Sequence, residues 1–125
     1  MKKISILILL LSALKFTYAQ DAGKITQALK QGNASAFAGY FDNLIDLKLP
    51  EKDELKNVGK TQATITIKSF FDNKGIKGFD VTSQREMGGT MYITGKLQGN
   101  GSSYNLTLLM KVRGDNLSII TVRIN

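Results

Sequence analysis

The 125-residue sequence contains no cysteine and no histidine. Without cysteine the chain can form neither a disulfide nor a thiolate metal site. Without histidine it lacks the most frequent general base and metal ligand of enzymes, so a histidine-based catalytic triad is excluded. The candidates for acid–base chemistry are tyrosine and aspartate side chains, and we expect neither a metal nor a cofactor.

Long hydrophobic runs are also absent. The longest, residues 4–14, is too short to cross a bilayer, which takes about 20 apolar residues. It follows Lys2 and Lys3 and precedes the segment Thr17-Tyr18-Ala19, an arrangement typical of a secretory signal peptide. We therefore predict cleavage after Ala19 and export to the periplasm or the medium. The alternative is an N-terminal membrane anchor that is left uncut.

Removal of residues 1–19 also changes the charge of the protein. The full chain has a formal net charge of +7, whereas the remaining chain keeps 14 basic and 10 acidic residues, a net charge of +4. We expect residues 20–125 to form a single domain, because their number suits one hydrophobic core. An exported domain would seldom meet nucleic acid, so we expect no nucleic-acid partner.

The C-terminal third of the chain predicts three β-strands in sequence, Met91–Leu97, Ser103–Arg113 and Leu117–Ile124. Apolar and polar residues alternate along each strand, which is the pattern of a half-buried strand. Short glycine- and asparagine-containing connections suit hairpins. The three strands are therefore expected to form an antiparallel meander with one apolar face, and upstream elements must cover that face.

The upstream half of the domain predicts two short helices and further strands. Asp21 is expected to cap the first helix, and Asn33 the second. Phe37, Phe41 and Leu44 have helical spacing and predict an apolar stripe on the second helix. Strands are expected over residues 44–49, 55–58 and 78–84, with a charged turn at 51–54 between the first two.

Residues 59–73 fit two structures. Ala63, Ile65 and Ile67 alternate with threonines, as in a strand, and their β-branched neighbours favour that choice. Ala63, Ile67, Phe70 and Phe71 instead share one face of a helix, for which Gly75 is a suitable end. The pattern alone does not decide between them.

In this order of elements the chain resembles DUF4783, a Bacteroidetes family of unknown function with a nuclear-transport-factor-2-like (NTF2-like) fold of the cystatin-like superfamily. The resemblance covers nearly all of the chain after the predicted signal peptide. The segments that carry it are Ala28–Ala34, Tyr40–Asn43, Gln62-Ala63, Phe70-Phe71 and the glycine-broken strands near Gly95 and Gly101. It implies an α+β fold in which helices pack on a curved, mainly antiparallel sheet to form a cone, and it implies a helix over residues 60–73.

Cone folds of this kind often bind a ligand between the helices and the sheet. The candidate pocket residues are Tyr40, Asp46, Phe71 and Tyr104; Asp42 is a further polar candidate. Tyr104 lies on the apolar side of its strand, so its hydroxyl needs a partner or a cavity. The competing interpretations are a core tyrosine that reaches the rim and, for Asp46, plain exposure to solvent.

The outer face of the meander is a candidate interface. Alternation places Leu109 outside, and with Ile120, Val122 and Ile124 predicted inside, it also places Ile119 outside. These two residues could form the centre of a weak homodimer contact. Basic residues surround them, namely Lys111, Arg113 and Arg123; the alternative is that this face is simply solvated.

Two functions follow from these observations. The first is a non-catalytic exported module that binds a small apolar ligand or a protein partner. The second is a small enzyme of the isomerase, dehydratase or hydrolase type that uses tyrosine and aspartate in a cone pocket. The sequence favours the first, because histidine and cysteine are absent and no carboxylate pair is placed on one face near Tyr104.

Overall fold

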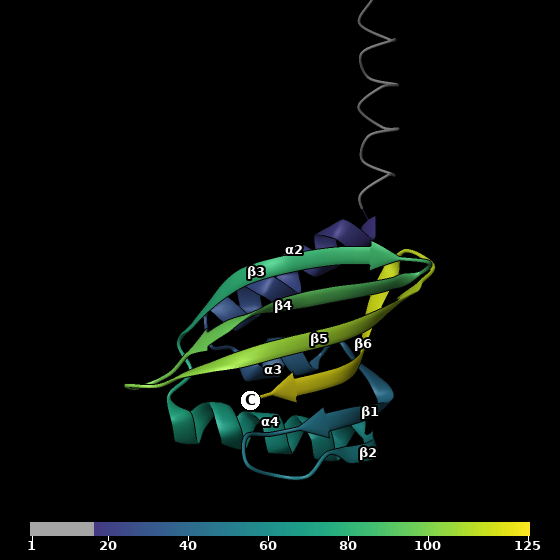
Figure 1. Ribbon diagram of the computed structural model, residues 1–125. Coiled ribbons are helices and arrows are strands. Elements are labelled where there is room, and N and C mark those ends of the chain that lie inside the picture. The colour runs from purple at the N-terminus through teal and green to yellow at the C-terminus, as the bar shows by residue number, and fades with distance from the viewer. Residues whose placement is uncertain (1–16) are drawn as a thin grey trace, which may run out of the picture.

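The computed structural model of the chain describes residues 17–125 (Figure 1). The first half contains helices and strands in the order α2 (Thr17–Lys30), α3 (Ala34–Ala38), β1 (Phe41–Lys48), β2 (Leu55–Gly59) and α4 (Lys60–Lys74). Four strands follow, namely β3 (Gly78–Met87), β4 (Thr90–Gln98), β5 (Ser103–Arg113) and β6 (Asn116–Ile124). No helix in this part of the chain is long and apolar enough to cross a bilayer.

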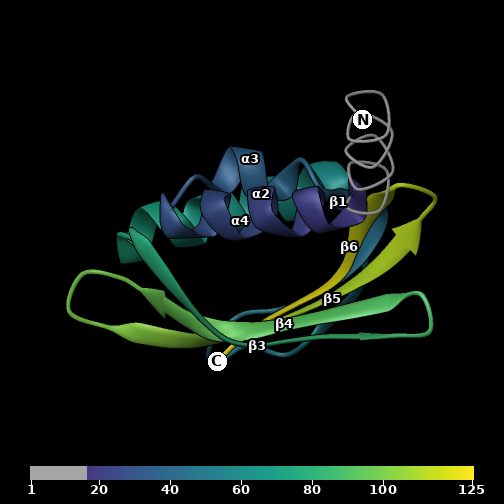
Figure 2. The same ribbon diagram turned by 90° about the horizontal axis from the view of Figure 1, so that it is seen from above.

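All six strands form one sheet in the order β2-β1-β6-β5-β4-β3. Neighbouring strands are antiparallel except β1 and β6, which are parallel. The sheet is curved, and the three helices lie together on its concave side (Figure 2). The predicted α+β architecture and the predicted meander are therefore confirmed.

The core lies between the concave face of the sheet and the helices. Leu106, Leu108 and Met110 of β5 are at most 1% exposed, as their alternation predicted. Every buried residue of the described chain is apolar. Hydrophobic burial is therefore what holds the helix layer on the sheet.

Helix α4 resolves the ambiguity over residues 59–73 in favour of the helix. Its buried residues are Ala63, Ile67, Phe70 and Phe71, which lie on one face at helical spacing. The helix ends at Gly75, which has the left-handed φ of 61°. The β-branched residues lowered helix propensity, but burial of the aromatic pair outweighs that preference.

Two expectations for the N-terminal helices were wrong. Helix α2 already begins at Thr17, so Asp21 does not cap it; the Asp21 carboxylate instead accepts a hydrogen bond from the Leu117 amide at 3.0 Å. The second helix ends at Ala38, and Phe41 and Leu44 belong to β1. Phe41 still faces the core, but Leu44 points away from it and is 55% exposed.

A β-bulge also overturns the predicted orientation of Ile119. The pairing of β5 with β6 shifts between Leu109–Thr121 and Met110–Ile119, so Ile120 is an extra residue in β6. Ile119 and Val122 both point inward and are fully buried, while Ile120 between them is half-buried. Simple alternation fails here because one inserted residue reverses the facing of the residues before it.

The packing predicts a large cost for truncating Phe71. Its ring is 3% exposed and stacks on Phe37 with centroids 6.0 Å apart. We expect Phe71→Ala to lower the free energy of unfolding by about 3–5 kcal/mol. Ile65→Ala is the control on the same helix: Ile65 is 57% exposed, so we expect a loss below about 1 kcal/mol. Urea unfolding followed by circular dichroism measures both, and equal midpoints for the two variants would contradict the arrangement.

Candidate functional site

A groove with a volume of about 700 Å³ opens between α4 and the turn that joins β1 to β2. It borders the core through Phe70, which is buried, and Tyr104, which packs against the core. The turn contributes Leu49, Pro50, Glu51 and Lys52; the helix contributes Ile65, Thr66, Ser69, Phe70, Asn73 and Lys74; and β5 contributes Tyr104.

Phe70 and Tyr104 form the aromatic floor of the groove. Their ring centroids are 5.3 Å apart and their planes meet at 71°, which is the favourable edge-to-face arrangement. Phe70 is 7% exposed, whereas Tyr104 is half-buried. Among residues 17–125 no group is hydrogen-bonded to the Tyr104 hydroxyl, so it is free to meet solvent or a ligand.

The wall opposite the helix is a tight turn. The Lys52 amide donates to the Leu49 carbonyl oxygen at 3.2 Å, with Pro50 at the second position, where its fixed φ suits a turn. Glu51 follows with a φ of 62°, a left-handed conformation that costs a non-glycine residue roughly 1–2 kcal/mol. Residues with strained backbones often occur at functional sites, so Glu51 is consistent with a functional role for this wall of the groove.

The helical wall presents polar side chains along one face of α4. Thr66, Ser69 and Asn73 follow one another at spacings of three and four residues. The Asn73 amide donates to the Ser69 hydroxyl at 3.4 Å. The ammonium groups of Lys52 and Lys74 make no hydrogen bond or ion pair with any described residue.

Of the four predicted pocket residues, the structure brings only Tyr104 to the groove. Phe71 lies one position along the helix from Phe70 and belongs to the closed core. Tyr40 is half-buried and packs against that core. Asp46 lies on the outer face of the sheet, so the predicted pocket does not form as a group.

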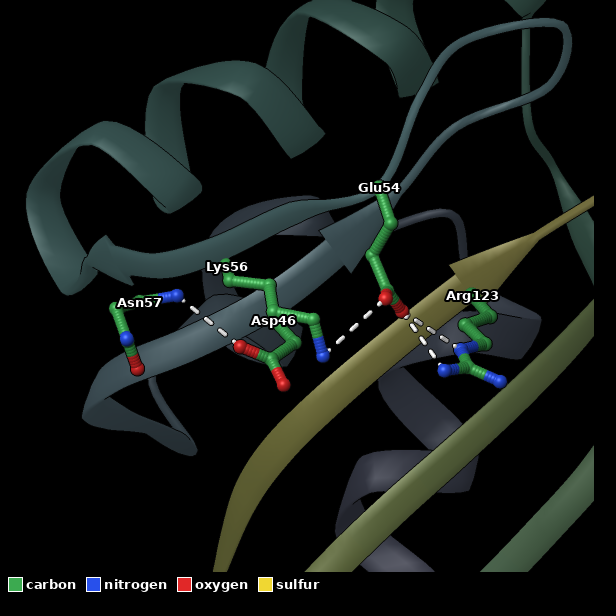
Figure 3. A network of polar contacts seen from close by, with 5 residues as sticks. All are labelled: Asp46, Glu54, Lys56, Asn57 and Arg123. Atoms are coloured by element: carbon green, nitrogen blue, oxygen red, sulfur yellow. Dashed lines mark hydrogen bonds and ion pairs between the residues drawn. The ribbon is translucent and has the colours of Figure 1, made fainter.

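Asp46 instead belongs to a polar network across the outer face of β2, β1 and β6 (Figure 3). Its carboxylate accepts a hydrogen bond from the backbone amide of Asn57 at 3.0 Å. At this point β2 has one residue more than β1 in the pairing of the two strands. Glu54, directly before β2, forms an ion pair of 2.8 Å with Arg123 of β6, which lies on the other side of β1, and it also contacts Lys56 at 3.5 Å. Ion pairs this exposed contribute about 0–1 kcal/mol each, so the network adds only modestly to the stability of this side of the sheet.

The other predicted aspartate is engaged as well. The Asp42 carboxylate forms an ion pair with Arg113 at 2.9 Å, between the beginning of β1 and the end of β5. The groove therefore has one carboxylate among its lining residues, that of Glu51, and one phenol, that of Tyr104. In the described part of the chain, no cluster of three or more acidic side chains could hold a metal ion.

The candidate interface is placed partly as predicted. Leu109 lies on the outer face and is half-buried, directly opposite Tyr92, which is 39% exposed. Ile119 is buried and cannot belong to this face, but half-buried Ile120 sits in the adjacent bulge. We call Tyr92, Leu109 and Ile120 the outer apolar strip. Lys111 is exposed on the same face, and the two predicted arginines are engaged in the ion pairs described above.

Sequence reasoning did not find the groove as a whole. A signal for it was present in the polar residues Thr66, Ser69 and Asn73, which share one helical face directly beside the aromatic pair. This face can be identified only once residues 59–73 are known to be helical. The position of the turn at Pro50 opposite that face is set by the packing of β1 against α4.

Comparison with known proteins agrees with this architecture. The sequence model of the family described as a domain of unknown function, DUF4783, matches residues 22–125. The search of curated proteins gives no match to the chain.

Solved structures of the same family are similar to this fold. A DUF4783 protein from Bacteroides ovatus has 22% sequence identity and a TM-score of 0.75, over 81% of this chain and 90% of its own. One from Bacteroides uniformis has 21% identity and a TM-score of 0.75, over 82% and 94%. An NTF2-like protein of unknown function from Cytophaga hutchinsonii has 13% identity and a TM-score of 0.57, over 83% and 84%. The chain thus belongs to the DUF4783 family and has an NTF2-like fold.

Proposed function

We propose that this domain is a non-catalytic binding module whose ligand site is the groove between α4 and the β1–β2 turn. The observation that carries the proposal is the aromatic floor of Phe70 and Tyr104 beneath a space of about 700 Å³. Ligand sites are typically concave, mainly apolar and of about 300–1,000 Å³, with a few polar groups that orient the ligand. The volume of the groove lies in this range and its floor is aromatic, while its walls are mixed: the apolar lining residues Leu49, Pro50 and Ile65 alternate with polar and charged ones. Its ligand would therefore combine an apolar body with polar groups.

The alternative, an enzyme that uses tyrosine and aspartate, has less support. The enzyme hypothesis needs a tyrosine and an aspartate within hydrogen-bonding reach of the same reacting atoms. Asp42 and Asp46 are held in contacts away from the groove. Tyr104 thus lacks the aspartate partner on which that mechanism depended.

Blocking the groove tests the binding proposal. The neutral dye phenylnaphthylamine should bind the wild type and gain fluorescence. Ser69→Trp places a large ring in the groove, so we expect it to weaken this binding at least about tenfold. Lys68→Trp is the matched control, because Lys68 is also exposed on α4 but does not line the groove. Fluorescence titration at a temperature where all variants are folded measures the affinities, and equal affinities of the two variants would refute the site.

We also propose that the domain is exported and cleaved after Ala19. The support is the basic and apolar pattern of residues 1–14; residues 1–16 lie outside the described part of the chain, and Ala19 lies in the first turn of α2. Mass spectrometry of the protein from its native host should give a chain that begins at Gln20. Ala19→Phe should leave the precursor uncut, because signal peptidases require a small residue there. An intact N-terminus on the wild-type protein would contradict export by this route.

A weak homodimer through the outer face of the sheet stays a prediction, now centred on the outer apolar strip. Three partly exposed side chains bury much less area than the roughly 800 Å² per partner of a stable interface, so we expect association only at high concentration. Surrounding basic residues such as Lys111 would repel across a symmetric contact, and salt should strengthen the dimer by screening them. Sedimentation of the wild type, Leu109→Glu and the same-face control Thr107→Glu tests this. A wild type that stays monomeric in high salt would rule it out.

A further inference from the structure

One end of the groove combines aromatic surface with a positive charge. Lys74 follows Phe70 by four residues on α4, so their Cβ atoms are about 5–6 Å apart on one helical face. The ring of Tyr104 contacts the same Phe70 from the sheet side. Lys74 and Tyr104 therefore both lie next to Phe70 in the lining of the groove, and neither the Lys74 ammonium nor the Tyr104 hydroxyl is bonded to another described residue.

The charge of the groove as a whole is also positive. Its charged lining residues are Lys52 and Lys74 on opposite walls and Glu51 on the turn. Asp53 adds a carboxylate in a small separate hollow that Lys52 also lines and that Phe70 does not. The end at Lys74 thus has a cation and two neutral donors, the Tyr104 hydroxyl and the Asn73 amide, and no carboxylate among its lining residues.

We propose that the groove binds an anionic amphiphile, an inference that rests on the binding function proposed above. The ring or chain of the ligand lies on Phe70 and Tyr104 and against Leu49 and Pro50. Its acidic head, a carboxylate, sulfate or sulfonate, lies at Lys74. The helix rises about 12 Å from Thr66 to Lys74 at 1.5 Å per residue, which sets the length of the ligand at about that of a two-ring compound or a medium chain.

The chemistry of the Lys74 end favours an anion over a neutral head. An ammonium group offers three donors and no acceptor, so it can satisfy several oxygens of an acidic head. Hydrogen bonds to ionised groups are roughly twice as strong as those between neutral groups. The long lysine stem can lie along the aromatic floor while its charge stays at the rim, so the same residue contributes apolar contact and charge.

A pair of dyes that differ by one charge tests the inference. Anilinonaphthalene sulfonate carries the ring system of phenylnaphthylamine with an added sulfonate. We expect the sulfonate to bind the wild type about fivefold tighter than the neutral amine, since the contact is partly exposed. Lys74→Gln should remove this preference and leave the affinity for the amine unchanged. Lys68→Gln, which removes an equal charge from α4 outside the groove, should leave both affinities unchanged, and added salt should weaken only the sulfonate.

The outcomes separate the two proposals. Equal affinities for both dyes, or equal effects of Lys74→Gln and Lys68→Gln, would overturn the anionic head while binding in the groove stands. Failure of Ser69→Trp to weaken either dye would overturn the groove itself, and the present inference with it. A loss of sulfonate binding in Lys74→Gln alone, with the melting temperature of the wild type kept, would support both.

Discussion

The concave face of the sheet is entirely apolar where the helices lie, and covering it is the constraint that organises this protein. A sheet with such a face exposes hydrocarbon to water unless another layer packs on it. Helix α4 meets this need with Ala63, Ile67, Phe70 and Phe71 on one face. The stacking of Phe71 on Phe37 also packs α4 against α3.

Curvature follows from irregularities in the strands. Pairing shifts in the β1–β2, β3–β4 and β5–β6 pairs insert extra residues, and bulges of this kind bend a sheet. Gly95 of β4 allows the close approach of β3, since a Cβ atom at this position would collide with the Phe79 ring and the Asp80 carbonyl oxygen. The ring of Phe79 thus occupies the space above that glycine, and the strands can approach closely.

The groove is a consequence of incomplete cover. Phe71 stacks on Phe37 inside the core, whereas its neighbour Phe70 contacts Phe71 on one side and Tyr104 at the edge of the core on the other. The groove separates the β1–β2 turn from α4 at this edge. Within the turn, Glu51 has the left-handed φ of 62°. The aromatic floor and the ammonium groups of Lys52 and Lys74, which have no partner among residues 17–125, are the features that support the proposed ligand site.

The meander, the apolar side of β5 and the lack of histidine and cysteine chemistry could be derived from the sequence by itself, because period-two alternation and composition are local properties of a chain. The resemblance to DUF4783 added the helix over residues 60–73, which propensity left open. Only the tertiary structure decided the facing of Ile119, since a single-residue bulge depends on how two strands pair. The tertiary structure also placed Tyr104 in the groove without Tyr40, Asp46 and Phe71. A pocket is made of residues that are distant in sequence, and packing, which no local pattern encodes, decides which of them meet.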